Sequence, residues 1–146
     1  MSIEELKDKV GAVWQSRVYE IEKGMLRRFA RAIEDPNPLW QDEEYARKTK
    51  YGGIIAPPTF MATLGLEQIQ QLLASAPSET SLHGSTELEC YQPVRAGDVV
   101  TATTRIADFR QRQGKMGTMS FVTFDITYEN QRGELVGRCR QMVINY

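Results

Sequence analysis

The sequence predicts a single α+β domain in which an antiparallel sheet of about five strands wraps one long central helix. Apolar residues recur at helical spacing before position 77, and they alternate with polar residues after position 81. No repeat, low-complexity tract or linker divides the 146 residues, and the hydrophobic 41% of them are spread evenly. We therefore treat residues 1–146 as one domain, within the size range that one hydrophobic core supports.

The first 50 residues are expected to hold three helices and one strand. Apolar spacing predicts a short helix through Ile3, Leu6 and Val10, a strand over residues 17–22 and a helix over residues 25–33. The turn at residues 35–38 contains two prolines, which stop that helix. Asp42 is a candidate N-cap for a further short helix over residues 43–49, which has acidic residues in its first turn and basic residues in its last.

The long central helix is predicted over residues 58–72, because Pro58 is tolerated in a first helical turn and apolar residues follow at helical spacing. Alternation then predicts strands over residues 86–90, 99–109, 120–128 and 135–144. Glycine and asparagine in the connections at residues 112–117 and 130–133 supply the positive φ angles that hairpins need. Such a sheet leaves an edge strand and an outer apolar face exposed, so we expect a dimer.

Composition limits the partners and the location. The 18 basic and 19 acidic residues are scattered and give a net charge of −1, so neither nucleic acid nor a membrane surface is an expected partner. The N-terminus lacks a secretory signal, and no stretch approaches the ~20 apolar residues of a membrane span, which predicts a cytoplasmic protein. Cys90 and Cys139 lack CxxC spacing and a neighbouring histidine, so we interpret them as buried free thiols and expect no metal site.

Four motifs occur in order along the chain. They are FARAIEDPNPLWQD at residues 29–42, YGGIIAPPTF at residues 51–60, LHG at residues 82–84 and PVRAGD at residues 93–98. Together they resemble the N-terminal domain of MaoC-like dehydratases, and the resemblance covers nearly the whole chain. It implies a hotdog fold that handles fatty acyl thioesters of CoA or acyl carrier protein, with no cofactor.

Active members of this family carry an aspartate and, five residues later, a histidine. Hydration of a 2-enoyl thioester needs two groups that take and return the proton of a water, and a backbone N–H that stabilises the enolate oxygen. This chain resembles the active members at Asp35, Asn37 and Pro38, but Trp40 stands where the histidine belongs. An indole cannot accept a proton, so Trp40 cannot replace the base.

The helix entrance also departs from the family pattern. Active single-domain hydratases carry His-Gly just before the helix, whereas this chain has Ala56, Pro57 and Pro58, and proline offers no N–H. The family includes paired hotdogs, fused or separate, in which one half keeps the aspartate and histidine while the other shapes the acyl tunnel. The resemblance implies that this chain is the second kind, in an (R)-specific enoyl-CoA hydratase or 3-hydroxyacyl thioester dehydratase. It would work as a homodimer or as a heterodimer with a second hotdog subunit, and it would be weak or inactive alone.

Several residues have two alternative interpretations each. Asp35 is either a vestige that caps a turn or a polar contact in the site. His83, the only histidine, either satisfies backbone groups at a strand start or serves as a substitute base at the tunnel mouth. The resemblance places Trp40, Phe60, Met61 and Leu64 near the acyl chain, with core packing as the alternative. Ala56 and Pro57 are further candidates for substrate binding, and Thr59 either offers its hydroxyl and N–H to the thioester oxygen or caps the helix. Five basic residues are either ligands of CoA phosphates or a solvated helix face: Arg27, Arg28, Arg31, Arg47 and Lys48.

Two other functions compete with the dehydratase subunit. One is a non-catalytic acyl-CoA-binding dimer in which Trp40 closes the old site. The other is an acyl-CoA thioesterase with Asp35 or Glu67 as its carboxylate, and the fold alone does not rank these functions. The motifs match dehydratases more closely, and they predict that Asp35, Trp40 and Pro57 lie together near the start of the central helix.

Overall fold

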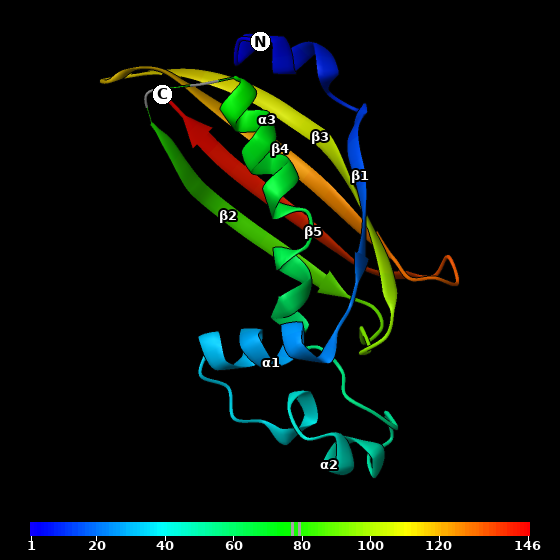
Figure 1. Ribbon diagram of the computed structural model, residues 1–146. Helices are drawn as coiled ribbons and strands as arrows, with labels where there is room; N and C mark the ends of the chain where they lie inside the picture. Colours follow the sequence, from blue (N-terminus) through cyan, green and yellow to red (C-terminus); the bar gives the residue numbers. More distant parts are fainter. Residues whose placement is uncertain (77, 79) are drawn as a thin grey trace.

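The computed structural model describes residues 1–76, 78 and 80–146 and contains one antiparallel sheet with strand order β1-β3-β4-β5-β2 (Figure 1). The strands are β1 (Val13–Glu20), β2 (Ser81–Cys90), β3 (Val99–Gly114), β4 (Gly117–Glu129) and β5 (Leu135–Asn145). The α-helices are α1 (Lys23–Ala32), α2 (Glu43–Arg47) and α3 (Leu66–Ser75), and the 3-10 helices are η1 (Glu4–Lys9), η2 (Pro38–Trp40) and η3 (Pro58–Thr63). The predicted α+β class and the five antiparallel strands are confirmed.

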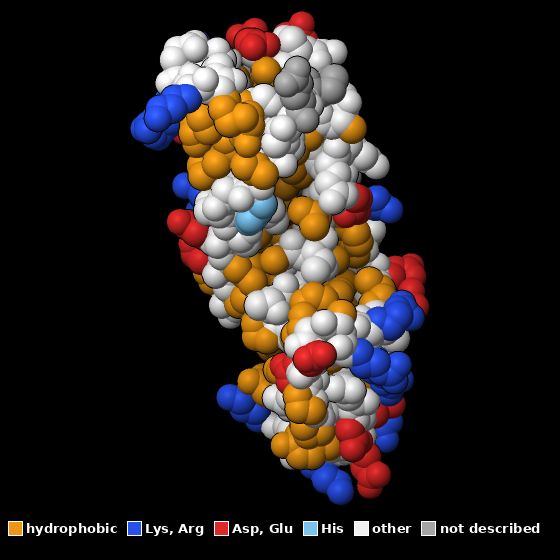
Figure 2. Space-filling view, turned by 90° about the vertical axis from the view of Figure 1, so that its left-hand side faces the viewer, with side chains coloured by type: hydrophobic (Ala, Val, Ile, Leu, Met, Phe, Trp, Pro, Cys, Tyr) orange, Lys and Arg blue, Asp and Glu red, His pale blue; other side chains and the backbone are white. Residues whose placement is uncertain are grey.

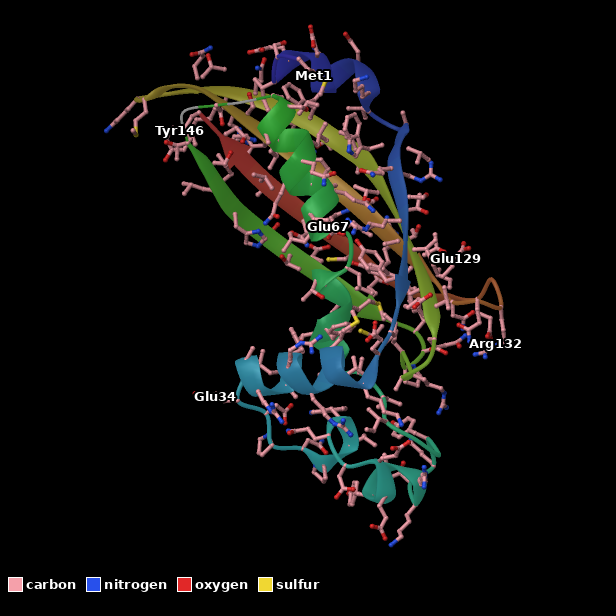
Figure 3. All side chains as sticks on the ribbon, viewed as in Figure 1. Met1, Glu34, Glu67, Glu129, Arg132 and Tyr146 are labelled. Atoms are coloured by element: carbon pink, nitrogen blue, oxygen red, sulfur yellow. The ribbon has the colours of Figure 1, made fainter. Side chains whose placement is uncertain are left out.

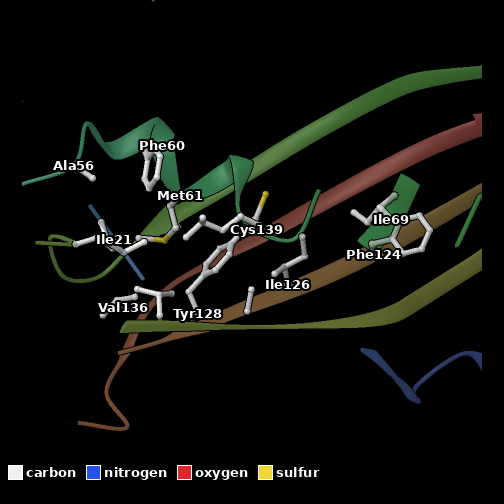
Figure 4. Close-up of a cluster of buried hydrophobic side chains, with 14 of the residues drawn as sticks. Ile21, Ala56, Phe60, Met61, Ile69, Phe124, Ile126, Tyr128, Val136 and Cys139 are labelled. Atoms are coloured by element: carbon white, nitrogen blue, oxygen red, sulfur yellow. Dashed lines mark hydrogen bonds between the residues drawn. The ribbon is translucent and has the colours of Figure 1, made fainter. Parts of the chain in front are cut away.

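The core lies between the concave face of the sheet and the helices that cross it (Figure 1). Alternate residues of β3 and β4 are buried along this face, as the two-residue period requires: Val100, Ala102, Thr104, Ile106, Val122, Phe124, Ile126 and Tyr128. From α3, Ile69 and Leu72 pack into the same cluster (Figure 4). Each such side chain contributes about 1.5–3 kcal/mol by burial, which holds α3 against the sheet.

The prediction of one continuous helix over residues 58–72 is wrong. η3 ends at Thr63, Leu64 is extended, and Gly65 has φ +87° before α3 begins at Leu66. The Tyr128 hydroxyl donates to the Leu64 carbonyl at 3.1 Å, and the Gly65 N–H donates to the Tyr19 hydroxyl at 3.0 Å. The Leu64 carbonyl and the Gly65 N–H belong to one peptide unit. Tyr128 and Tyr19, both from the sheet, therefore satisfy both polar groups of the peptide at the break.

The half-buried strand predicted over residues 86–90 is longer and more exposed than expected. β2 begins at Ser81, and only Leu88 is partly buried, because β2 is an edge strand whose contact with the helices is to η3, which the Cys90 end approaches. Cys90 is exposed, which corrects its interpretation as a buried thiol, whereas Cys139 is buried as expected. Burial raises the pKa of the Cys139 thiol, so the thiol form is favoured there.

The N-terminal elements are displaced from their predicted positions. The first helix is the short η1 with Leu6 as its buried residue, and the first strand covers residues 13–20 instead of 17–22. Asp42 caps α2 by accepting from the Tyr45 N–H at 3.1 Å, as predicted. Both predicted hairpins form, with Gly117 and Gly133 at positive φ in their turns. Across the described ranges, no helix has the length and apolarity that crossing a membrane requires.

Candidate functional site

The segment that carries the aspartate motif is a tight turn between α1 and α2. Asp35 accepts from the Asn37 N–H at 3.0 Å, and Asn37 in turn accepts from the Leu39 N–H at 3.0 Å. The side chain of Gln41 donates to the Asp35 carbonyl at 2.8 Å, which closes the turn. Both polar side chains of the motif therefore cap backbone groups, as Asp and Asn commonly do in turns. A contact between Asp35 and a ligand stays a prediction.

Trp40 is buried at the end of this turn. It packs with Ala30 of α1 and with Ile55, and Leu39 and Tyr51 cover the cluster. Only 8% of Trp40 is exposed, and its indole N–H finds no partner among the described residues. Ile55 lies two residues before Pro57, so the structure brings Trp40 to the helix entrance. Asp35 joins this region through Gln41.

A pocket of about 220 Å³ opens beside the helix entrance. One wall is formed by residues 55–58 with Met61, and the other by Cys90 and residues 91–94. The Ala56 N–H donates to the Val94 carbonyl at 2.7 Å, and the Ala96 N–H donates to the Ile54 carbonyl at 3.0 Å, so backbone pairing joins the two walls. Because backbone hydrogen bonds join the two walls, the fold itself fixes the shape of the pocket.

The predicted substrate-contact residues divide into two groups. Ala56, Pro57 and Met61 line the pocket. Phe60 is buried edge-to-face against Phe29 at 5.5 Å, Leu64 is buried, and Thr59 is exposed. Sequence reasoning missed Tyr51 and the second wall, which consists of Cys90 and residues 91–94. The PVRAGD motif, residues 93–98, begins within that wall, so it is the sequence feature that could have indicated this part of the pocket.

His83 does not lie at this pocket. It is exposed near the start of β2, where its Nε2 is 2.9 Å from the hydroxyl of Thr86. Cys90, at the pocket end of the same strand, is seven positions further along, which corresponds to roughly 23 Å at ~3.3 Å per residue. The structure therefore does not bring the only histidine of the chain to Trp40 or Pro57.

Glu67, the other carboxylate considered for catalysis, is engaged at the helix break. It accepts a hydrogen bond from the Tyr19 hydroxyl and forms an ion pair with Arg17 at 2.9 Å. Burial, followed by the hydrogen bond to Glu67, raises the pKa of Tyr19 to about 12. Glu67 thus belongs to the structure that holds Gly65, which disfavours the thioesterase hypothesis built on this residue.

The basic residues near the first motif are mostly engaged. Arg27 donates to the Gln41 carbonyl at 3.2 Å, Arg47 pairs with Glu43 at 3.4 Å, and Lys48 pairs with Glu44 at 3.8 Å. Arg28 and Arg31 are exposed. These contacts favour a solvated helical surface over a built phosphate site.

A larger hollow of about 590 Å³ lies on the outer face of the sheet, between β3, β4 and β5. Arg110, Arg112 and Arg140 surround it, and Phe121 and Met142 form apolar parts of its lining. None of the four motifs contributes a residue to this hollow. We therefore place the candidate site at the smaller pocket, where motif residues meet. In the described part of the chain, no group of three or more His, Cys, Asp or Glu side chains is arranged to hold a metal ion.

Comparison with known proteins agrees with this architecture. The family model described as "FAS1-like, dehydratase domain region" matches residues 8–138. A UPF0336 protein from Thermobifida fusca is 35% identical over 113 residues, which cover 74% of each chain. The MaoC-like dehydratase from Rhodospirillum rubrum superposes with a TM-score of 0.73 at 27% identity, over 100% of this chain and 97% of that one. The HadBC (3R-hydroxyacyl-ACP dehydratase) complex from Mycobacterium tuberculosis contains a chain with TM-score 0.81 at 24% identity, over 94% of this chain and 98% of that one.

Proposed function

Because the chain belongs to the MaoC-like hotdog family of dehydratases and hydratases, we propose that it is the acyl-binding subunit of a hydro-lyase that hydrates 2-enoyl thioesters or dehydrates 3-hydroxyacyl thioesters. In this proposal the chain shapes the acyl site, and a second hotdog subunit supplies the aspartate and histidine that move the proton. The acyl group is carried by CoA or by acyl carrier protein. Alone, the chain is a very poor hydratase.

The observation that carries this proposal is the burial of Trp40, the residue that stands in the motif where the active members of the family resembled here carry a histidine. Its indole packs against Ala30 and Ile55 and has no basic lone pair. His83 is the only imidazole of the chain and lies near the other end of β2. In this proposal the imidazole base comes from another subunit, since proton transfer requires hydrogen-bond reach of the substrate or of one water.

The residues at the helix entrance also support the proposal that a second subunit supplies the catalytic groups. Pro57 and Pro58 have no N–H, and the Ala56 N–H is already bonded to the Val94 carbonyl. None of the three residues therefore offers a backbone donor to an enolate oxygen. Removing one such donor commonly lowers kcat by 10²–10³-fold, so this loss adds to the loss of the base.

The exposed edge of β2 is the surface on which we place the second subunit. β2 has β5 as its one neighbour in the described sheet, and Leu82 and Tyr91, at and just beyond its two ends, are about half exposed. Figure 2 shows hydrophobic side chains spread along the face of the molecule on this side. An unpaired edge with apolar surroundings favours pairing with another strand. Because Cys90 ends β2 and lines the pocket, a subunit paired there would border the acyl site.

Co-expression with a hotdog chain that carries both the aspartate and the histidine tests the proposal directly. We expect a stoichiometric complex that changes the enoyl absorbance of crotonyl-CoA, and almost no turnover by this chain alone. Trp40→His should give this chain only a modest gain, because the backbone donors are still missing, and Asp35→Ala should leave its low basal rate unchanged.

Two results would contradict the subunit proposal. Strong turnover by the wild-type chain alone, dependent on Asp35 or His83, would make it an enzyme with a different base. Acyl-CoA binding by a homodimer that forms no complex with a catalytic hotdog would identify a non-catalytic binding protein. Copurification of the native protein reports which oligomer forms in the cell.

A further inference from the structure

We propose that Met61 sets the length of the acyl chain that the pocket accepts, because its thioether closes the passage from the pocket into the core. The inference rests on the proposed function, since it assigns a substrate class, short acyl thioesters, to the same pocket. Met61 is 3% exposed and lines the pocket from η3. Figure 4 shows its side chain projecting from η3 toward the strands that carry Val136, Cys139 and Tyr128.

Met61 rests directly on the backbone of the sheet. A Cβ at Gly137 would overlap the Met61 sulfur and would lie 2.9 Å from its ε-methyl carbon. The same Cβ would lie 2.8 Å from the Glu89 carbonyl oxygen, so β2 and the thioether both approach Gly137 closely. Gly137 pairs with Cys90 in β2 and with Tyr128 in β4. Met61 therefore reaches the sheet at the strand position next to the pocket-lining Cys90.

The side chains beyond Met61 belong to the fully buried core. Tyr128, Val136 and Cys139 have no exposed surface, and Leu64 is 3% exposed. An acyl chain that fills the pocket and continues inward must therefore displace Met61. The pocket volume of about 220 Å³ is below the roughly 300–1,000 Å³ of ordinary small-molecule sites, which favours a short acyl group.

Hydrogen bonds fix the backbone that follows Met61, so its side chain can change conformation while the backbone stays in place. Tyr128 and Tyr19 hold the Leu64–Gly65 peptide, three residues after Met61, and Thr63 donates to the Phe60 carbonyl at 2.7 Å. A methionine has three rotatable bonds and a polarisable thioether, and it adapts to irregular spaces. These properties allow Met61 to close the passage while η3 keeps its position.

The test compares wild type with Met61→Ala, Met61→Leu and Met142→Ala. The last variant is a matched control, because Met142 lines the hollow on the outer face of the sheet. Binding of butanoyl-, hexanoyl-, octanoyl- and decanoyl-CoA is measured by calorimetry. Wild type and Met142→Ala should gain affinity only up to a short chain. Met61→Ala should continue to gain roughly fourfold per added methylene, since each buried CH₂ is worth ~0.8 kcal/mol. Met61→Leu, which keeps most of the bulk, should lie between them.

A second measurement tests the pocket without a thioester. The chain has six methionines, and ¹³C-methyl labelling reports each of them. Addition of n-butanol, n-hexanol or n-octanol should shift the Met61 methyl signal, assigned from Met61→Leu. The signal of Met116, which is 77% exposed in the β3–β4 turn, should stay in place.

The combined outcomes separate this inference from the proposed function. An unchanged chain-length profile in Met61→Ala, or no response of the Met61 methyl group to any alkanol, overturns the role of Met61. Length-dependent alkanol binding that Met61→Ala extends, together with no acyl-CoA binding and no turnover in any complex, keeps Met61 as the limit of an apolar pocket. That result rejects both the dehydratase function and the acyl assignment.

Discussion

η3 and α3 follow one another along the concave face of the sheet (Figure 3), yet they fold differently. α3 is a regular α-helix whose buried residues, Gln68, Ile69 and Leu72, pack on the sheet. η3 begins with a proline, is a 3-10 helix and borders the pocket with Met61. Both helices have backbone hydrogen bonds of their own, and the Leu64–Gly65 peptide that separates them is bonded to Tyr128 and Tyr19 of distant strands. The chain thus forms a 3-10 helix instead of an α-helix where it borders the pocket.

The largest effect that distinguishes the two halves is expected from truncating their buried side chains. Leu72→Ala in α3 should cost about 3 kcal/mol of unfolding free energy, because a fully buried leucine leaves a cavity. Met61→Ala in η3 should cost about 2 kcal/mol, since one side of Met61 already faces the pocket. Urea denaturation measures both, with the exposed Thr59→Ala as a near-neutral control. An equal or larger loss at Met61 would show that η3 is as tightly packed as α3.

The glycine between the halves provides the next comparison. Gly65→Ala places a Cβ at φ +87° and only 3.2 Å from the Ile126 δ-methyl carbon. Gly52→Ala is a matched control, because Gly52 also has a positive φ, +69°, but no atom lies within 4 Å of its added Cβ. The left-handed conformation alone costs about 1 kcal/mol, and the packing conflict should raise the loss at Gly65 to about 2 kcal/mol. Equal losses of stability in thermal unfolding would mean that α3 moves away from Ile126 freely.

The periodicity of the sequence predicts α3 and the five strands, because burial on one face imposes a regular spacing. It does not predict the break at Gly65, since a single glycine inside a helical pattern is usually tolerated. The groups that stabilise the break, Tyr19 and Tyr128, lie 46 and 64 positions away from it in the sequence. Contacts at that separation leave no local signal in the chain.

The candidate site, like the fold, has one part that the sequence predicts and one part that it does not predict. The motifs locate Trp40, in the turn that follows α1, and Ala56–Pro58, which follow the Ile55 that packs against Trp40. The second wall, from Cys90 to Val94, reaches the pocket because the Ala56 N–H bonds to the Val94 carbonyl, 38 positions later. Alternation also shows which residues of β2 share a face, but not that the face is uncovered. That property depends on what packs against it, and the same is true of the exposed Cys90.

Removing the two hydroxyl groups at the break should have smaller, unequal effects. Tyr128→Phe leaves the buried Leu64 carbonyl without its donor and should cost about 1–2 kcal/mol. Tyr19→Phe removes the acceptor of the Gly65 N–H at a partly buried position, where water can substitute, so the loss should be below about 1 kcal/mol. Chemical denaturation of both variants checks this order. A larger loss for Tyr19→Phe would place the main support of the break on β1 instead of β4.

The smallest effect is a pH dependence at the same break. The pKa of Tyr19 is raised to about 12, first by burial and then by the hydrogen bond to Glu67, whereas an unfolded tyrosine titrates near 10. Folding therefore favours the protonated phenol, and its stabilising contribution is complete below pH 10 and is lost as the pH rises toward about 12. The difference in unfolding free energy between wild type and Tyr19→Phe should consequently shrink between pH 10 and 12. Tyr128, whose pKa burial also raises, is present in both proteins and cancels in the comparison. A difference that stays constant or grows over this range would show that the Tyr19 hydroxyl does not hold the break as a hydrogen-bonded phenol.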